Sequence, residues 1–191
     1  MRTQTIKTEL RPLNEQPNQV YLGMGVHTLG LLAWILEQTG PAKVLVTTFS
    51  TSDEFLSGFL NLRKKGLIIG ASLLADLKAC KKTVKLEELM RQCFERVYLG
   101  NNHSKLLLIM NDKWQVSVIS SQNNTYGGRN ECTFITTDED IHLKLCEKLY
   151  DIQRDSVKID GIHRGTTEED RTAGSHAHSS LGDFRPFGVE E

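Results

Sequence analysis

The sequence has few cysteines and no long hydrophobic run, and both features narrow the class of protein. No Cys-x-x-Cys pair is present, so the sequence predicts neither a disulfide framework nor a zinc site. We interpret the thiols as reduced and mostly buried. The four cysteines stand far apart, at Cys80, Cys93, Cys132 and Cys146. No segment approaches the roughly 18 consecutive apolar residues of a membrane span, and residues 1–16 lack the apolar core of a signal peptide. We therefore expect a cytoplasmic protein without a membrane span.

A strong charge of either sign is also missing from the chain as a whole. The formal net charge is -1, and 39% of the 191 residues are hydrophobic, which is typical of an ordinary soluble protein and excludes a disordered chain. The charge is unevenly distributed, however. Residues 61–96 contain nine Lys or Arg against four Asp or Glu, whereas residues 138–191 contain seven against thirteen. The first segment could therefore meet a polyanion that the second would repel.

Strand and helix patterns alternate along the chain and predict an α/β fold. Strands are predicted at residues 19–25, 43–49, 67–74, 96–99, 103–110, 114–120 and 131–136, and helices at 28–38, 50–65, 84–94 and 138–150. Residues 50–53 offer capping side chains for the helix that runs to Lys65, and the helix at 138–150 is also predicted to be capped. Residues 111–113 form the polar turn of a predicted β-hairpin. Because most strands are separated by helices, we expect a mixed, largely parallel sheet flanked by helices on both faces.

The apolar periodicity divides the chain into three parts. We predict an extended N-terminal arm at 1–18, one α/β domain at 19–155 and a flexible polar C-terminal tail at 156–191. The last nine residues restore two aromatic residues, Phe184 and Phe187, around Pro186. This segment could be a docking peptide for a partner, although packing on its own domain, or no role at all, is the favoured interpretation.

A histidine and a lysine stand one residue apart at the head of an apolar strand pattern, at His103 and Lys105. Alternate residues of a strand point to the same side, so the two side chains are predicted to project together. Ser121 and Asn123 follow after the hairpin. A proton carrier, a fixed cation and these donors are groups suited to phosphate oxygens.

This set resembles the signature of the phospholipase D superfamily, in which His-x-Lys is followed by Asp and then by Gly-Ser-x-Asn. Glu131 stands where that family often has an acidic residue that orients the histidine. The resemblance covers residues 19–155 and departs from the pattern in three places. Met110 occupies the position of the Asp, with Asp112 two residues later, and Ser120 replaces the Gly. The third departure is the number of motifs, since the family's active site uses two His-x-Lys motifs and this chain has one.

The resemblance implies a metal-independent phosphodiesterase that needs no cofactor. His103 would attack phosphorus to give a phosphohistidine, while Lys105, Ser121 and Asn123 would hold the phosphoryl oxygens and Glu131 would fix the tautomer of the histidine. A homodimer would bring two copies of the single motif together across its two-fold axis. Among possible substrates we favour nucleic acid, and we therefore predict a nuclease with a shared site.

Two other functions stay open, a binding or regulatory module of the same fold and a lipid phosphodiesterase. The residues predicted to bind nucleic acid are basic, and they are Arg63, Lys64, Lys65, Lys81, Lys82 and Arg129. His27 could line the same cleft, although a histidine at a helix start is more often structural. The remaining histidines, which are His142, His163, His176 and His178, are interpreted as solvated.

Overall fold

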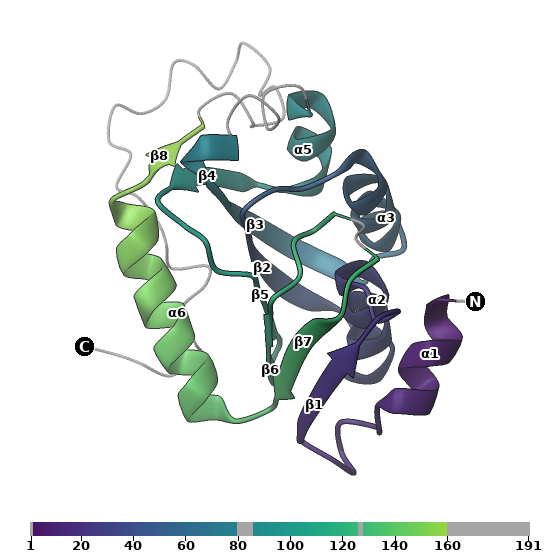
Figure 1. Cartoon of the computed structure of the whole chain (residues 1–191). Coiled ribbons are helices and arrows are strands. Elements are labelled where there is room, and N and C mark those ends of the chain that lie inside the picture. Colours follow the sequence, from purple (N-terminus) through teal and green to yellow (C-terminus); the bar gives the residue numbers. More distant parts are fainter. Residues whose placement is uncertain (1, 80–85, 126–127, 160–191) are drawn as a thin grey trace.

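The computed structural model describes residues 2–79, 86–125 and 128–159, which form one mixed sheet flanked by helices (Figure 1). The strands are β1 (Asn18–Gly23), β2 (Ala42–Thr48), β3 (Ile68–Asp76), β4 (Arg96–Gly100), β5 (Leu106–Met110), β6 (Gln115–Ser120), β7 (Glu131–Thr136) and β8 (Val157–Lys158). The helices are α1 (Arg2–Glu9), α2 (Thr28–Thr39), α3 (Asp53–Lys64), α5 (Glu87–Cys93) and α6 (Glu139–Arg154), with a short 3-10 turn, η1, at Leu77–Ala79. The α/β class is confirmed.

The prediction of a largely parallel sheet is wrong. The eight strands are ordered β1-β7-β6-β5-β2-β3-β4-β8, and within this order only the β2–β3 and β3–β4 pairs are parallel. The other five pairs are antiparallel. The two parallel pairs are those whose strands are joined through a helix. The β5–β6 and β6–β7 pairs are joined by connections without a helix, which suit antiparallel pairing of neighbouring strands.

Helices α1, α2, α3 and α5 cover one face of the sheet, and α6 covers part of the other (Figure 1). Alternate residues of β2 point to the two faces of the sheet. Val44 and Val46 belong to the larger hydrophobic core, whereas Leu45 belongs to a smaller core with Leu149 of α6. Two side-chain caps predicted from sequence are present. Ser52 accepts a hydrogen bond from the Phe55 amide at the start of α3, and Asp138 accepts one from the Ile141 amide at the start of α6.

The N-terminal arm is helical in part, and the expectation of an extended arm is wrong for residues 2–9. Ile6, Leu10 and Leu13 are almost completely buried and belong to the core beneath α2. The amide of Leu13 also donates to Gln38 Oε1 at 2.8 Å. Ile6 is the apolar residue of α1 that reaches this core, where it lies against Gly30 of α2, a contact that no local pattern in residues 1–18 reveals.

His142 is buried, which corrects its interpretation as a solvated residue. Its side chain is 1% exposed, and Nδ1 lies 2.9 Å from the hydroxyl of Ser117 on β6. Burial lowers the pKa of His142 to about 4, and a hydrogen bond with the Val116 backbone opposes the shift without cancelling it. His142 is therefore a neutral core residue at pH 7. The histidines His163, His176 and His178 lie outside the described residues.

The sheet continues past the predicted end of the domain. Strand β8 pairs with β4, the Ile159 amide donates to Val97 O at 3.0 Å, and Ser156 Oγ donates to Ile152 O at 2.7 Å. Residues 156–159 thus belong to the folded unit rather than to a polar tail, because their backbone completes the edge next to β4. Residues 160–191, including the predicted docking peptide, lie outside the described residues.

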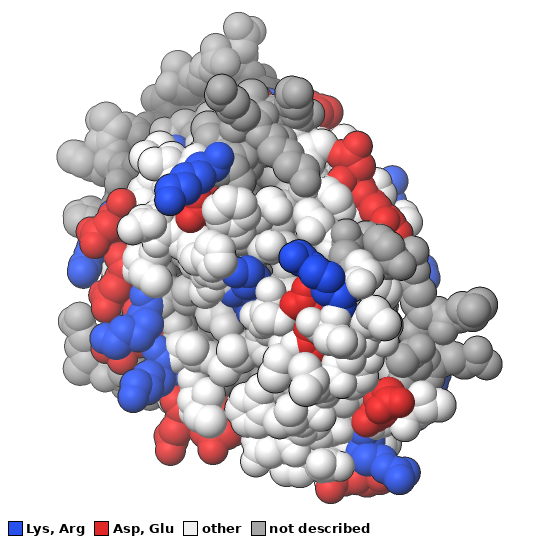
Figure 2. Space-filling view, viewed as in Figure 1, with Lys and Arg blue, Asp and Glu red and all other residues white. Residues whose placement is uncertain are grey.

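Helix α6 leaves part of its sheet face uncovered. Val20, Phe134 and Ile119 lie opposite one another on β1, β7 and β6, and Leu22 lies opposite Cys132. Leu22 is 74% exposed and Val20 67%, and we call these five residues the apolar sheet patch. Figure 2 shows a broad, mostly uncharged surface over β1, β6 and β7 beside the charged surface of α6. An uncovered apolar sheet face next to a polar rim is typical of an interaction surface.

Candidate active site

His103 and Lys105 lie together at the edge of the sheet. Lys105 Nζ is 2.9 Å from His103 Nδ1 and donates to the backbone oxygen of His103 at 2.8 Å. The imidazole also packs against Phe49, which follows β2, with ring centroids 5.3 Å apart. An ammonium group can only donate, so Nδ1 accepts and the neutral ring carries its proton on Nε2. In this arrangement the exposed His103 can donate a hydrogen bond through Nε2.

The two residues precede the strand on which they were predicted, since β5 begins at Leu106 and not at His103. In the residues before β5, side-chain hydrogen bonds take the place of the backbone hydrogen bonds that pair strands. Ser104 Oγ bonds to Asn102 Oδ1 at 2.5 Å and lies 2.8 Å from Thr47 Oγ1, which in turn accepts from the Leu106 amide. Such local polar bonds compete with regular strand pairing and hold the backbone in a loop. The sequence signal for this loop is the polar run from Asn101 to Lys105 before the Leu-rich strand.

Ser121 and Glu131 lie at the same edge, where β6 ends and β7 begins. The Ser121 hydroxyl donates to Glu131 and accepts from the Cys132 amide at 3.1 Å. Ser120, in the position of the family's Gly, has a hydroxyl that accepts from the Gln122 amide at 3.1 Å and lies 3.0 Å from Thr133 Oγ1. The carboxylate of Glu131 is therefore held beside Ser121, and its predicted bond to His103 stays a prediction.

The loop after Ser121 is attached to three other elements. Gln122 Oε1 accepts from both the amide and the hydroxyl of Thr28 at the start of α2, at 2.9 and 3.0 Å. The Asn124 amide donates to Thr48 Oγ1 at 3.2 Å, and Ser52 Oγ donates to Asn124 O at 3.1 Å. These bonds fix Asn123 between them. Its Oδ1 is buried without a hydrogen-bond partner among the described residues, so it can take a ligand group.

Met110 and Asp112, the two positions compared with the family's Asp, lie on either side of Asn111 at the hairpin. Met110 is buried, Asp112 is exposed, and the turn is held by Asn111. Asn111 Oδ1 accepts from the amides of Lys113 and Trp114 at 3.0 Å, while Nδ2 donates to the backbone oxygens of Thr39 and Pro41. Sequence reasoning missed Asn111, although asparagine at a turn start is a known signal.

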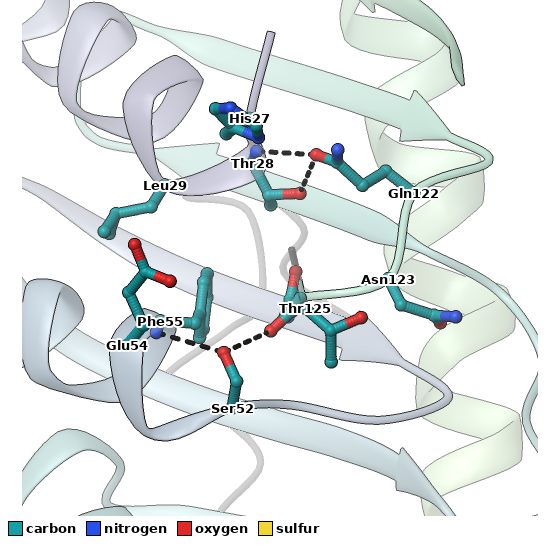
Figure 3. A pocket seen from close by; sticks show the side chains of 10 residues that line it. His27, Thr28, Leu29, Ser52, Glu54, Phe55, Gln122, Asn123 and Thr125 are labelled. Carbon is teal, nitrogen blue, oxygen red and sulfur yellow. Dashed lines mark hydrogen bonds between the residues drawn. The ribbon is translucent and has the colours of Figure 1, made fainter. Parts of the chain in front are cut away.

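An open pocket of about 370 Å³ lies between the first turns of α2 and α3 and the loop after β6 (Figure 3). Asn123 stands at its margin, so the pocket adjoins the candidate site. His27 is one wall, as the sequence suggested, together with Leu29, Glu54, Phe55 and Asn124. Figure 3 shows Glu54 and Phe55 pointing from α3 toward α2, and Gln122 directed at Thr28.

The basic residues predicted to bind nucleic acid are not gathered at this edge. Arg63 forms an ion pair with Glu95 and donates to Cys93 O at 2.8 Å. Although burial by itself would raise the pKa of Glu95, hydrogen bonds from Arg63 and the Ala71 amide hold it below its usual value. Lys64 and Lys65 end α3, whose 12 residues extend about 18 Å from the pocket. Arg129 is exposed two residues before Glu131, and Lys81 and Lys82 lie outside the described residues.

The described residues contain no group of three or more His, Cys, Asp or Glu side chains that could hold a metal ion. Within the same residues, no helix is long and apolar enough to cross a membrane. The cysteines are free, and they differ in exposure. Cys93 is buried, Cys146 is half-buried and Cys132 is exposed on the apolar sheet patch, so the expectation of mostly buried thiols holds only in part. Cys80 lies outside the described residues.

No protein-family model and no curated sequence matches the chain. Its structure is similar to Nuc from Salmonella typhimurium, a phospholipase D family member, with a TM-score of 0.57 and 14% identity over 74% of this chain and 98% of Nuc. The fold is phospholipase D-like. NucT from Helicobacter pylori gives a TM-score of 0.55 and 15% identity, over 74% of this chain and 98% of NucT. TrmBL2, an archaeal chromatin protein with a novel mode of DNA binding, gives 0.50 and 10%, over 81% and 59%.

The phospholipase D-like fold confirms the resemblance inferred from His103, Lys105 and the residues after the hairpin. The residues that carry the motif lie at one edge of the sheet, because β5, β6 and β7 run antiparallel and place the start of one strand beside the end of the next.

Proposed function

We propose that this protein is a metal-independent phosphodiesterase, a nuclease, that works through His103 at a site shared by two chains. The observation that carries the proposal is the contact of Lys105 Nζ with His103 Nδ1 at the sheet edge where β6 and β7 present Ser121 and Glu131. A cation, a proton carrier and buried amide groups at one edge are suited to hold a phosphodiester and to transfer its phosphoryl group.

The reaction would proceed in two displacement steps. When the phosphate binds, Lys105 moves from His103 Nδ1 to a phosphoryl oxygen, the ring proton of His103 passes through solvent from Nε2 to Nδ1, and Nδ1–H donates a hydrogen bond to Glu131. The partner's His103 enters the reaction as the imidazolium, with a proton on both ring nitrogens. Nε2 of His103 attacks phosphorus, the bond to the leaving oxygen breaks, and that oxygen takes a proton from the partner's His103. Water then loses a proton to the partner's His103 and attacks phosphorus, which breaks the phosphorus–nitrogen bond and restores His103.

The apolar sheet patch supports the shared site. The patch begins close to the site residues, because Ile119 is two residues from Ser121 and Cys132 follows Glu131 directly. A second copy of the chain that covers the patch would bury its apolar area and lie beside the site. We therefore propose that the patch is the dimer interface, since a closed two-fold dimer uses the same surface on both chains.

The choice of nucleic acid as the substrate needs support of its own, because a fold alone does not determine a substrate. The structural likeness to TrmBL2, whose description names DNA binding, supports nucleic acid. Arg129 supports it as well, because this exposed cation lies two residues from Glu131 and could contact a neighbouring phosphate. Lys64 and Lys65 lie at the far end of α3 and would bind only a long substrate.

One observation favours a binding module as the second candidate function. In the present arrangement Lys105 bonds to His103 Nδ1 and Glu131 bonds to Ser121, so the ring is not oriented as a nucleophile through Nε2. If substrate does not rearrange these bonds, the site can bind a phosphate without turnover.

A hydrolysis assay in excess chelator separates the two functions. Single- and double-stranded DNA and RNA are incubated with the wild type, Lys105→Ala and Lys113→Ala, beside bis(p-nitrophenyl) phosphate. Lys113 is a matched control, since it is an exposed lysine at the other end of the same strand. We expect turnover by the wild type and Lys113→Ala and a loss of about 10²-fold or more for Lys105→Ala. Binding without hydrolysis by the wild type would establish the binding module instead.

The dimer has its own test in sedimentation. Leu22→Glu places a charge in the apolar sheet patch and should give a monomer with a folded far-UV spectrum. Ile69→Glu is the control, because Ile69 is also exposed, at 59%, but lies on β3. A dimer that persists in Leu22→Glu, or a monomeric wild type at micromolar concentration with full activity, would contradict the shared site.

A further inference from the structure

The pocket between α2 and α3 contains groups that the proposed reaction does not use. Asn124 is 4% exposed, lines the pocket, and its Nδ2 has no hydrogen-bond partner among the described residues. A buried amide donor without a partner is costly unless a ligand or water satisfies it. The backbone of Asn124 is held by hydrogen bonds with Thr48 and Ser52, which fix the position from which its side chain extends.

The opposite wall supplies an acceptor and apolar surface. Glu54 extends from the first turn of α3 toward α2, beside the ring of Phe55 and the side chain of Leu29 (Figure 3). A carboxylate accepts hydrogen bonds at four lone-pair sites and donates none. An anionic ligand is disfavoured here, because Asp53 and Glu54 already place negative charge at the positive end of α3.

The complement of this pocket is a flat, uncharged ring with a donor at one edge and an acceptor at another. We propose that the pocket binds the nucleobase next to the scissile phosphate, and that it prefers bases with an exocyclic amino group. The amino group of adenine or cytosine would donate to Glu54, and an acceptor atom of the base would accept from Asn124 Nδ2. Thymine and uracil lack the amino donor. This inference rests on nucleic acid as the substrate of the adjoining site, which the pocket meets at Asn123.

Direct binding tests the pocket independently of hydrolysis. Fluorescein-labelled single-stranded decamers of dA, dC and dT are titrated against the full chain carrying His103→Asn, which prevents turnover during the measurement. We expect dA and dC to bind about tenfold more tightly than dT, as one base-specific hydrogen-bonded contact usually provides. The variant Glu54→Ala in the same background should reduce this preference to less than about twofold.

Asp53→Ala is the matched control, because both substitutions remove one exposed carboxylate from the first turn of α3 and only Glu54 lines the pocket. Removal of either charge should strengthen binding of all three decamers equally, so the ratio of affinities isolates the base contact. Asn124→Ala, compared at equal thermal stability, should weaken the binding of all three decamers, because thymine also carries acceptor atoms, and should leave the ratio of their affinities unchanged.

Three results would overturn the inference. They are an equal affinity of the parent for the three decamers, a preference that survives Glu54→Ala, and a preference lost equally in Asp53→Ala. Failure of the nuclease proposal would give a different result. The wild type would then not hydrolyse DNA or RNA, while the preference for dA and dC over dT in binding would persist.

Discussion

The buried histidine of α6 makes the stability of the fold depend on pH in a predictable direction. His142 has a pKa of about 4 in the folded chain against an ordinary value of 6.5. Between these values the unfolded chain binds a proton that the folded chain excludes, so the free energy of unfolding rises with pH across this window and falls on acidification. The charged form is disfavoured because the ring is 1% exposed in the core.

The size of the effect follows from the two pKa values. Linkage gives a loss of about 2 kcal/mol between pH 7 and pH 5 and about 3 kcal/mol by pH 4. For a chain of this length, 2 kcal/mol corresponds to a fall in melting temperature of about 4–8 °C. Glu95, whose pKa is below its usual value, loses its contribution at lower pH, so the range from 7 to 5 isolates the histidine.

Urea unfolding of the wild type and His142→Gln at pH 7, 6 and 5 measures the contribution. Glutamine keeps an acceptor for the hydroxyl of Ser117, which is completely buried, and it does not titrate. The difference between the two proteins should narrow by about 2 kcal/mol as the pH falls to 5. Parallel stability curves over this range would refute the assignment of His142 as a neutral core residue.

Two further predictions concern the edges of the fold. Truncation after Ile159 should leave the melting temperature nearly unchanged, whereas truncation after Asp155 removes β8 and should lower it. Equal melting temperatures of the two truncated chains would show that β8 adds no stability. Arg63→Ala should destabilise the chain by about 1–3 kcal/mol in urea unfolding, because the backbone oxygen of the buried Cys93 and the carboxylate of Glu95 lose a donor, while Lys64→Ala should stay within about 0.5 kcal/mol. Equal effects of the two substitutions would show that these contacts of Arg63 add no stability.

Local signals in the sequence predicted the elements from β1 to α6, and most of their ends to within two residues, but missed α1 and β8. The strand at residues 131–136 and the caps Ser52 and Asp138 depend on neighbouring residues only, and the structure has all three. Strand pairing depends on residues far apart, and no pattern in β2 states that β5 will pair with it in the antiparallel sense. The predicted parallel sheet failed for that reason.

The burial of His142 could have been predicted. It lies at helical spacing from Leu145, Cys146 and Leu149, the apolar stripe with which α6 meets the sheet. Treating histidine as polar hid this signal. The loop from Asn101 to Lys105 could not be predicted in this way. Its shape depends on hydrogen bonds with Thr47 of β2, which is far away in sequence.

The candidate site was predicted as a set of residues and not as an arrangement. Sequence placed His103, Lys105, Ser121, Asn123 and Glu131 near one another through the hairpin, and the structure brings them to one edge of the sheet. The contact between Lys105 and His103 Nδ1 and the bond between Ser121 and Glu131 depend on side-chain rotamers. The pocket at Asn124 needed the first turns of α2 and α3 to converge, which is a tertiary property.

Subunit mixing tests the shared site most directly. Wild type and His103→Asn are unfolded together in equal amounts, refolded, and assayed on bis(p-nitrophenyl) phosphate in excess chelator, with separately refolded samples as controls. If each site needs His103 from both chains, only dimers of two wild-type chains are active. Random pairing then leaves about a quarter of the activity of a sample that contains the same total amount of protein, all of it wild type. If the mixture keeps about half of the activity of the all-wild-type sample, each chain works alone, and the account is contradicted.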